Sequence, residues 1–219
     1  MYIDINGIKL FYEQTGIGEP IILLHGNGQD HEIFDKLIAQ LSKNFTVYSL
    51  DNRSHGKSSK VKELSYDDMT EDVVKFIQAL KIEKPILLGF SDGGIIGMLL
   101  AIKYPHILSK MVIIGANLNP GGIKEHIRLL IKFTYTFTRS SKFKLMITQP
   151  DISTTELEKI MIPTLILAGE NDFIKEEHTK TIAHSISCSK LKIVEKENHT
   201  SFVVHSPKLY EIVKSFLLK

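Results

Sequence analysis

The stretch that most constrains the fold is Gly-Phe-Ser-Asp-Gly at residues 89–93, which joins an apolar run at 85–89 directly to a helix-like run at 94–102. Because no residues remain for an ordinary loop, only a sharp turn can connect the two. Glycines at both ends of the turn let strand and helix approach closely, and Ser91 between them can take a strained conformation that exposes its hydroxyl. The sequence therefore predicts a nucleophile elbow centred on Ser91.

Apolar runs of strand length alternate with helix-like segments along the rest of the chain, after an opening hairpin that turns at Asn6-Gly7. The runs are too short and too uniformly hydrophobic for amphipathic helices, so they indicate buried strands. This alternation predicts a single α/β domain over residues 1–219, with a mostly parallel sheet and helices on both faces. We expect strands at 2–5, 8–14, 20–24, 45–50, 85–89, 110–115, 163–169 and 191–195, and helices at 32–41, 66–80, 94–102 and 207–218.

Residues 117–157 separate two predicted strands and are far longer than a usual strand connection. We interpret them as an insertion that forms a short helical cap over the sheet. Ile127, Leu130 and Ile131 lie near one helical face and are expected to face Ser91 and limit the substrate group that fits. Another face carries basic residues, namely Lys124, Arg128 and Lys132. The alternative is a packing helix with a solvated basic face and no contact with a ligand.

The loops that follow parallel strands carry the candidate catalytic residues, because ligands bind beyond the carboxyl ends of such strands. Asp172 follows the strand that ends at Gly169, and His199 follows the strand that ends near Glu195. We expect His199 to act as general base and then acid for Ser91, with Asp172 fixing the histidine tautomer. The order serine, acid, histidine along the chain is that of α/β-hydrolases.

Two other residues could take these roles. Glu170 could replace Asp172 as the acid, although it lies closer to the strand end. His205 follows His199 by six residues but stands just before Ser-Pro, where a new helix starts, so we interpret it as structural. The remaining histidines show no metal-ligand spacing such as H-E-x-x-H, and we predict neither a metal nor a cofactor.

The loop His-Gly-Asn-Gly at 25–28 follows another apolar strand. Its glycines allow backbone N–H groups to turn toward a developing negative charge. We predict an oxyanion hole formed by the backbone N–H groups of Asn27 and Asp92, with Gly26 beside the bound substrate. The alternative is a tight turn chosen only for its conformation.

As a set, these loops resemble the α/β-hydrolase superfamily over almost the whole chain, through residues 25–28, 51–58, 89–94 and 169–172 together with His199. Within it, the elbow sequence followed by Lys-Tyr-Pro at 103–105 and Met-Val-Ile-Ile-Gly-Ala-Asn at 111–117 is similar to the biphenyl hydrolase-like, or valacyclovir hydrolase, group. The resemblance implies an α/β-hydrolase fold and a serine esterase that prefers α-amino acid esters. The chain departs from its relatives at Ser54, where they usually carry glycine, and in an insertion that is shorter than many caps.

The resemblance also implies roles for single residues. It makes Ser91 the nucleophile, Asp172 the acid and His199 the base, and it makes Asp92 a candidate for binding a substrate ammonium group. The alternative for the Asp92 carboxylate is a salt bridge with Arg53 or with a cap lysine.

We therefore predict a hydrolase of small carboxylic esters that works through an acyl-enzyme intermediate. The same scaffold also supports carbon–carbon bond hydrolysis, acyl transfer to a small acceptor and perhydrolysis, and the triad does not separate these reactions. A non-catalytic ligand-binding receptor is disfavoured, because it would not need serine, acid and histidine together.

Charge and composition limit the partners. A net charge of +2, from 27 basic and 25 acidic residues, argues against a general nucleic-acid binder. Cys188 is the single cysteine and cannot form an internal disulfide. The sequence opens without a basic or apolar leader, and no apolar run approaches the roughly 18 residues of a membrane span. We expect a cytoplasmic protein with a small-molecule ester as substrate and no membrane partner, and the sequence indicates nothing about its oligomeric state.

Overall fold

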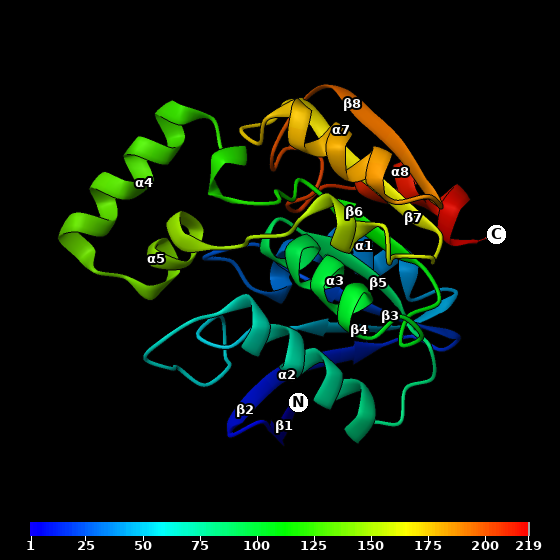
Figure 1. Cartoon of the computed structure of the whole chain (residues 1–219). Coiled ribbons are helices and arrows are strands. Elements are labelled where there is room, and N and C mark those ends of the chain that lie inside the picture. The colour runs from blue at the N-terminus through cyan, green and yellow to red at the C-terminus, as the bar shows by residue number, and fades with distance from the viewer. Residues whose placement is uncertain (219) are drawn as a thin grey trace.

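The computed structural model describes residues 1–218, and its centre is a sheet of eight strands (Figure 1). The strands lie in the order β1-β2-β4-β3-β5-β6-β7-β8. β2 is antiparallel to both β1 and β4, whereas every pair from β4 to β8 is parallel. The mostly parallel sheet that the sequence predicts is therefore confirmed. The strands are β1 (Tyr2–Ile5), β2 (Ile8–Thr15), β3 (Glu19–Leu24), β4 (Phe45–Leu50), β5 (Ile86–Phe90), β6 (Met111–Ile114), β7 (Thr164–Asn171) and β8 (Ser189–Asn198).

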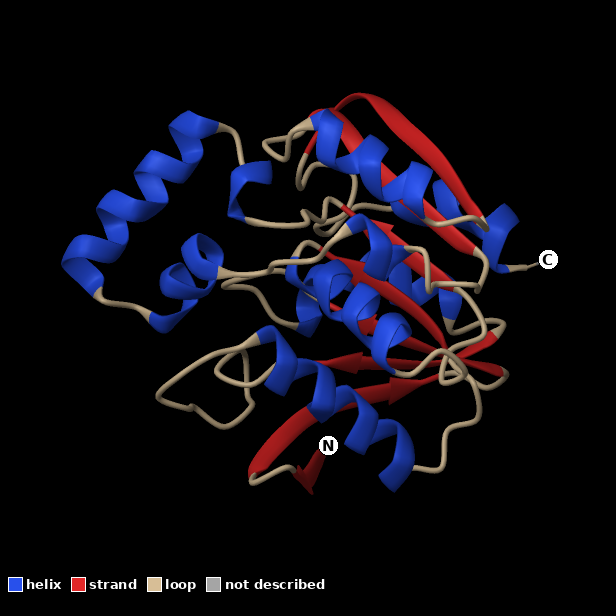
Figure 2. Ribbon diagram, viewed as in Figure 1, coloured by secondary structure: helices blue, strands red, loops and turns tan. Residues whose placement is uncertain are grey.

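Helices cover both faces of this sheet, as Figure 2 shows. α1 and α8 pack on one face, and α2, α3 and α7 pack on the other. Sequence patterns predicted α1, α2, α3 and α8 but missed α7, whose buried residues are Thr179 and Ile182. The helices are α1 (Asp35–Leu41), α2 (Tyr66–Ala79), α3 (Asp92–Lys103), α4 (Glu125–Thr138), α5 (Ser141–Thr148), α6 (Thr154–Leu157), α7 (Glu176–Ser185) and α8 (Lys208–Leu217), with 3₁₀ turns η1 (His31–Phe34) and η2 (Pro120–Gly122).

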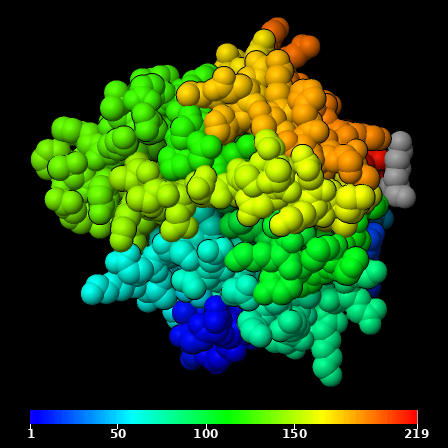
Figure 3. Space-filling view, viewed as in Figure 1, coloured from blue at the N-terminus to red at the C-terminus, as the bar shows by residue number. Residues whose placement is uncertain are grey.

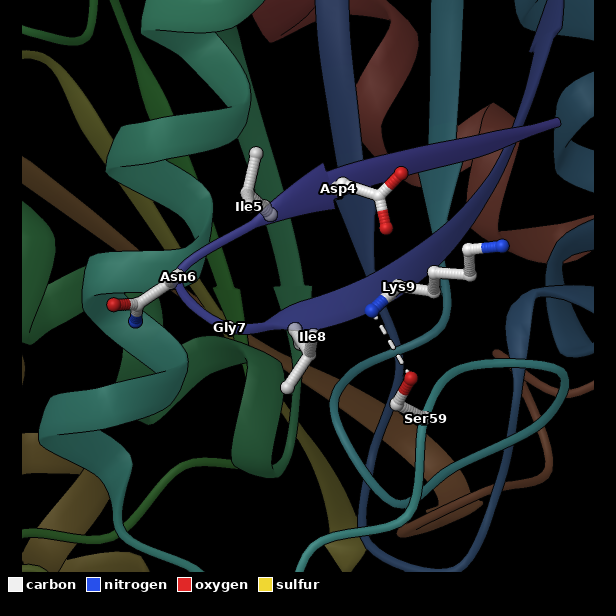
Figure 4. Close-up of a pocket in the computed structure, with 7 residues that line it drawn as sticks. All are labelled: Asp4, Ile5, Asn6, Gly7, Ile8, Lys9 and Ser59. Carbon is white, nitrogen blue, oxygen red and sulfur yellow. Dashed lines mark hydrogen bonds between the residues drawn. The ribbon is translucent and has the colours of Figure 1, made fainter.

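The chain opens with the predicted hairpin, drawn in Figure 4. Asn6 and Gly7 form its turn with φ angles of 47° and 75°, the left-handed conformations that a tight two-residue turn requires. The backbone N–H of Lys9 donates to Ser59 Oγ over 3.0 Å and ties the hairpin to the loop after β4 (Figure 4). A hollow of about 420 Å³ lies between the hairpin and Ser59, at the antiparallel edge of the sheet.

The sharp turn predicted between strand and helix is present, because β5 passes into α3 through Ser91 alone. The serine has φ 53° and ψ −112°, a conformation that residues with side chains rarely adopt. A Cβ atom at Gly89 would overlap the carbonyl group of Gly93, and a Cβ atom at Gly93 would overlap the carbonyl group of Leu24 at the end of β3. The close approach of strand and helix therefore needs glycine at both positions.

Residues 117–157 connect β6 to β7 and contain η2, α4, α5 and α6. α4 and α5 pack on each other beyond one end of the sheet, with α4 at the outer edge of the molecule and α5 nearer the sheet (Figure 1). The insertion thus holds two main helices where the sequence patterns indicated one. Across residues 1–218, every helix is too short or too polar to cross a membrane.

We expect Gly93→Ala to lower the free energy of unfolding by about 2 kcal/mol or more, because the new methyl group would meet backbone that cannot move aside. Gly94→Ala is the matched control on the same helix turn. There the new Cβ atom would lie 3.1 Å from the Ala116 and Ile113 side chains and 3.2 Å from the Gly89 carbonyl oxygen, which is far less crowded than the overlap with the Leu24 carbonyl oxygen at Gly93. Denaturant unfolding of both variants checks the difference, and equal midpoints would contradict the tight strand–helix contact.

Candidate active site

Ser91 lies at the carboxyl end of β5 and lines a cavity of about 360 Å³. His199 follows β8 and lines the same cavity. α5 forms the opposite wall with Lys142, Phe143 and Met146. The fold therefore brings the serine and the predicted histidine, which are far apart in sequence, to one cavity with a largely apolar wall.

The imidazole of His199 is held by Asp172, which directly follows β7. His199 Nδ1–H donates to Asp172 Oδ1 over 2.7 Å, and both side chains are buried. The backbone N–H of Ile174 donates to the same carboxylate oxygen over 2.8 Å. Because a carboxylate can only accept, Nδ1 carries the proton and Nε2 is left as the basic nitrogen.

The imidazole is also fixed by its packing. Its ring centroid lies 4.8 Å from that of Phe90 and 3.9 Å from that of Phe173. Gly115, with φ 61°, lies against the edge of the ring, where an added Cβ atom would be 2.8 Å from His199 Cε1. Sequence reasoning missed both Phe173 and Gly115, although the glycine that ends a buried apolar run at 110–115 was a visible signal.

The two rival residues lie elsewhere. Glu170 is exposed and accepts a hydrogen bond from the backbone N–H of Lys196 over 2.7 Å. His205 is exposed, and its Nδ1 lies 3.1 Å from Asp35 Oδ1. Neither takes the place of the buried acid–histidine pair. Within residues 1–218, no three His, Cys, Asp or Glu side chains are grouped so that they could hold a metal ion.

Buried His25 orients the loop that leads to Asn27. Its Nδ1–H donates to the Gly26 carbonyl over 2.7 Å, and its Nε2 accepts from the backbone N–H of Asn52 over 3.0 Å. Burial lowers the pKa of His25 to about 3, so the imidazole is neutral and keeps both hydrogen bonds at neutral pH. In the sequence this histidine stands out only as part of the His-Gly-Asn-Gly motif. The two hydrogen bonds by which it orients the loop are seen only in the structure.

The two amides predicted for the oxyanion hole are free. The backbone N–H groups of Asn27 and Asp92 find no acceptor in the described part of the chain. Asp92 is the first residue of α3, so its N–H belongs to the positive end of the helix dipole. A Cβ atom at Gly26 would lie 3.0 Å from Ser91 Cβ, which places this glycine directly beside the serine.

The Asp92 carboxylate is buried next to the serine and is held by two neutral donors. Tyr66 OH donates to Oδ1 over 2.8 Å, and Asn27 Nδ2 donates to Oδ2 over 2.9 Å. Burial raises the pKa of the Asp92 carboxyl to about 6. The expected alternative of a salt bridge with Arg53 is wrong, because that guanidinium pairs with Asp72 over 2.6 Å. The cap lysine of that alternative is Lys142, which forms no ion pair with Asp92 in the described residues but is near enough for its charge to lower the pKa of the carboxyl.

The prediction that α4 lines the substrate pocket is wrong. Leu130 is 60% exposed and does not face Ser91. Ile127 and Ile131 pack in an apolar cluster beneath α4, outside the cavity lining. The reason is that α4 lies at the outer edge of the cap and α5 lies nearer the sheet, so α5 supplies the apolar side chains that reach the cavity, Phe143 and Met146.

Several known proteins are similar to this chain in sequence. A sequence-family model described as alpha/beta hydrolase fold matches residues 19–139. The human protein "Serine hydrolase BPHL" is 30% identical, over 98% of this chain and 85% of that protein. Ethanol acetyltransferase 1 of Cyberlindnera jadinii is 36% identical over a shorter stretch, 44% of this chain and 29% of that protein.

Solved structures show the same fold. An esterase from Exiguobacterium antarcticum superposes with a TM-score of 0.86 at 22% identity, covering 100% of this chain and 99% of that one. The meta-cleavage product hydrolase CumD of Pseudomonas fluorescens superposes with a TM-score of 0.84 at 20% identity, covering 100% and 97%. At these identities the likeness extends to the fold alone.

We expect Gly115→Ala to displace the imidazole, because the new methyl group would lie 2.8 Å from His199 Cε1 and 2.9 Å from Nδ1. In proton NMR spectra, the low-field signal of the His199–Asp172 hydrogen bond should shift or disappear. Gly7→Ala is the matched control, since it has a similar φ of 75° with no atom within 4 Å of the added Cβ. An unchanged signal in Gly115→Ala would show that the contact with residue 115 does not hold the imidazole in place.

Proposed function

Because the chain belongs to the alpha/beta hydrolase fold family, we propose that it cleaves small carboxylic esters through an acyl-enzyme intermediate on Ser91. The observation that carries the proposal is the buried His199–Asp172 pair, which meets the strained elbow serine at one cavity. An imidazole with a free Nε2 is the base that a serine needs to become a nucleophile.

In the first half of the proposed reaction, His199 Nε2 takes the proton of the Ser91 hydroxyl as its oxygen attacks the ester carbonyl. The N–H groups of Asn27 and Asp92 bind the negative charge that develops on the carbonyl oxygen. Losing one such donor typically costs about 3 kcal/mol of transition-state stabilisation. Asp172 stabilises the imidazolium that forms and keeps it aligned.

In the second half, His199 gives its proton to the leaving alcohol as the ester C–O bond breaks, and the acyl group stays on Ser91. The same imidazole then takes a proton from a water molecule that attacks the acyl-enzyme. The tetrahedral intermediate releases the carboxylic acid, and the proton returns to the Ser91 oxygen. One imidazole thus acts as base and then as acid for two nucleophiles in turn, the Ser91 hydroxyl and a water molecule.

The cavity supports a small substrate. Its volume of about 360 Å³ is near the lower end of small-molecule sites, which range over about 300–1,000 Å³. Phe90, Phe143, Met146 and Phe173 supply an apolar wall suited to a short acyl or alkyl group. These side chains replace the residues of α4 as the proposed limits on substrate size.

Asp92 supports a finer proposal, a preference for α-amino acid esters. With a pKa of about 6 the carboxyl is ionised at neutral pH, and its two hydrogen-bond donors are neutral. A substrate ammonium would supply a direct ion-pair partner, whereas the charge of Lys142 acts on Asp92 without forming an ion pair. A hollow lined by Ser91, Asp92 and Gln149 among others has a volume of about 10 Å³, roughly the space of one water molecule, so an ammonium group would have to widen it. An ammonium about 4 Å away in a partly desolvated site would gain on the order of a few kcal/mol.

A fluorophosphonate probe should label Ser91, and intact-protein mass spectrometry should show a single adduct that Ser91→Ala abolishes. His199→Ala should lower the hydrolysis of p-nitrophenyl acetate by about a thousandfold or more, and Asp172→Asn by somewhat less, because the three residues act as a unit. Turnover by His199→Ala within about tenfold of the parent would exclude it as the base. An adduct that survives Ser91→Ala would exclude the proposed nucleophile.

The amine preference is tested with an α-amino acid ester and its des-amino analogue. The parent should prefer the amino ester by about tenfold or more, and Asp92→Asn, which keeps the backbone N–H, should lose the preference. Because Asp92 must be ionised and the substrate amine protonated, the preference should be greatest between about pH 6 and pH 8. A parent without preference, or one whose preference survives Asp92→Asn, would leave a general small-ester hydrolase.

A further inference from the structure

α4 has apolar residues on two faces. Its inner face packs Ile127 and Ile131 against the cluster beneath the cap. Four large side chains of the same helix are instead exposed, by 55 to 72%, and form what we call the outer face, namely Leu129, Leu130, Phe133 and Phe137. Ten large hydrophobic side chains are exposed in the described residues, so one helix holds four of the ten.

The spacing of these residues places them on one stripe. Leu129, Phe133 and Phe137 follow one another at i, i+4 and i+8, and Leu130 lies three residues before Phe133, which are the intervals of one helical face. The rings of Phe133 and Phe137 pack edge to face with centroids 4.8 Å apart. The outer face is therefore a continuous apolar surface, and scattered exposed hydrophobic residues do not form such a surface.

The second half of α4 also has few polar groups that require water. The hydroxyl groups of Thr134, Thr136 and Thr138 donate to the carbonyl oxygens of Leu130, Lys132 and Thr134, four residues earlier in each case, over 2.9, 3.0 and 3.0 Å. Hydroxyl groups bonded within the helix in this way can leave water at little cost. The helix can thus enter an apolar medium on this side.

Basic residues border the outer face. Residues 124–148 hold six of the chain's 27 basic residues and one of its 25 acidic residues, Glu125, which pairs with Arg128 over 2.7 Å. The rest of the chain therefore has 21 basic and 24 acidic residues. Lys132 and Arg139 are exposed and form no ion pair within residues 1–218. Residues 124–148 are therefore strongly positive. The whole insertion at 117–157, which also holds Asp151 and Glu156, has a net charge of +3, whereas the rest of the chain has a net charge of −1.

We propose that the outer face of α4 is a docking surface for an anionic lipid bilayer. The helix would lie flat in the interface, with Leu129, Leu130, Phe133 and Phe137 among the acyl chains and Lys132 and Arg139 at the lipid phosphates. Charge complementarity favours this occupant over a second copy of the chain, because pairing two such faces would bring two positive caps together. Docking goes beyond the proposed hydrolysis, since it requires none of its steps, and it revises the expectation that no membrane is a partner.

α4 is positioned so that its outer face can contact a bilayer. It lies at the outer edge of the molecule, and in the space-filling view of Figure 3 the cap stands out from the body. α5 packs against α4 and also lines the cavity through Phe143 and Met146. A bilayer bound at the outer face would therefore lie one helix layer away from the proposed site of hydrolysis.

Co-sedimentation of the purified chain with vesicles tests the proposal. The parent should sediment with vesicles of phosphatidylcholine and phosphatidylglycerol, less with phosphatidylcholine alone, and less again at about 0.5 M salt. Phe133→Ser with Phe137→Ser should lower the bound fraction of protein by about tenfold or more. Lys132→Gln with Arg139→Gln should weaken binding to the anionic vesicles by about twenty-five-fold, since each basic residue contributes about fivefold.

Matched controls distinguish loss of the outer face of α4 from a general loss of exposed hydrophobic or basic side chains. Ile17→Ser with Met161→Ser removes two other side chains, 89% and 66% exposed, and Lys43→Gln with Lys75→Gln removes two other exposed charges. Both double variants should bind like the parent. Circular dichroism melts establish that each variant folds, independently of any hydrolase activity.

Three results would overturn the proposal. The first is a parent that stays in the supernatant with anionic vesicles, and the second is retention of full binding by the Phe133→Ser, Phe137→Ser variant. The third is a concentration-dependent dimer in analytical ultracentrifugation that the same variant abolishes, because the outer face would then be covered by a second copy of the chain.

Discussion

The contact between α3 and the ends of β3 and β5 is the constraint on which the site depends. Gly93 lies against the carbonyl of Leu24, and Gly89 against the carbonyl of Gly93, so the helix starts as close to the strands as backbone allows. This approach holds Ser91 in a strained conformation with its side chain at the cavity. It also points the first amides of α3 toward the same place, where the helix dipole favours negative charge.

Everything else in the site is positioned by the parallel sheet. β5, β7 and β8 run in one direction, so the residues that follow them, Ser91, Asp172 and His199, meet at one edge. The loop after β3 lies at the same edge of the sheet, and the neutral, buried His25 orients it. The buried carboxylate next to the serine, Asp92, is the feature least expected near an oxyanion, and a cationic substrate group would compensate it.

The cap illustrates where sequence patterns mislead. α4 has apolar residues on two faces, and its periodicity alone could not tell which face packs inward. The pattern correctly placed Ile127 and Ile131 on an apolar face, but the structure turns them toward a cluster beneath the cap and leaves Leu130 outside. α5, which no pattern singled out, supplies the cavity wall. The sequence can therefore predict that a helical insertion exists. It cannot predict which face of a helix packs inward, because this depends on the loops at both ends of the insertion.

The sequence by itself determined the eight strands, the helices α1, α2, α3 and α8, the elbow at Ser91 and the loops that hold Asp172 and His199. These follow from local periodicity, glycine placement and the direction of parallel strands. Only the tertiary structure decided that Tyr66 holds Asp92, that Arg53 turns instead to Asp72, and that Gly115 makes room for the imidazole. These contacts join residues from 19 to more than 80 positions apart, and each depends on which side chains a packed core brings within reach, which no local pattern records.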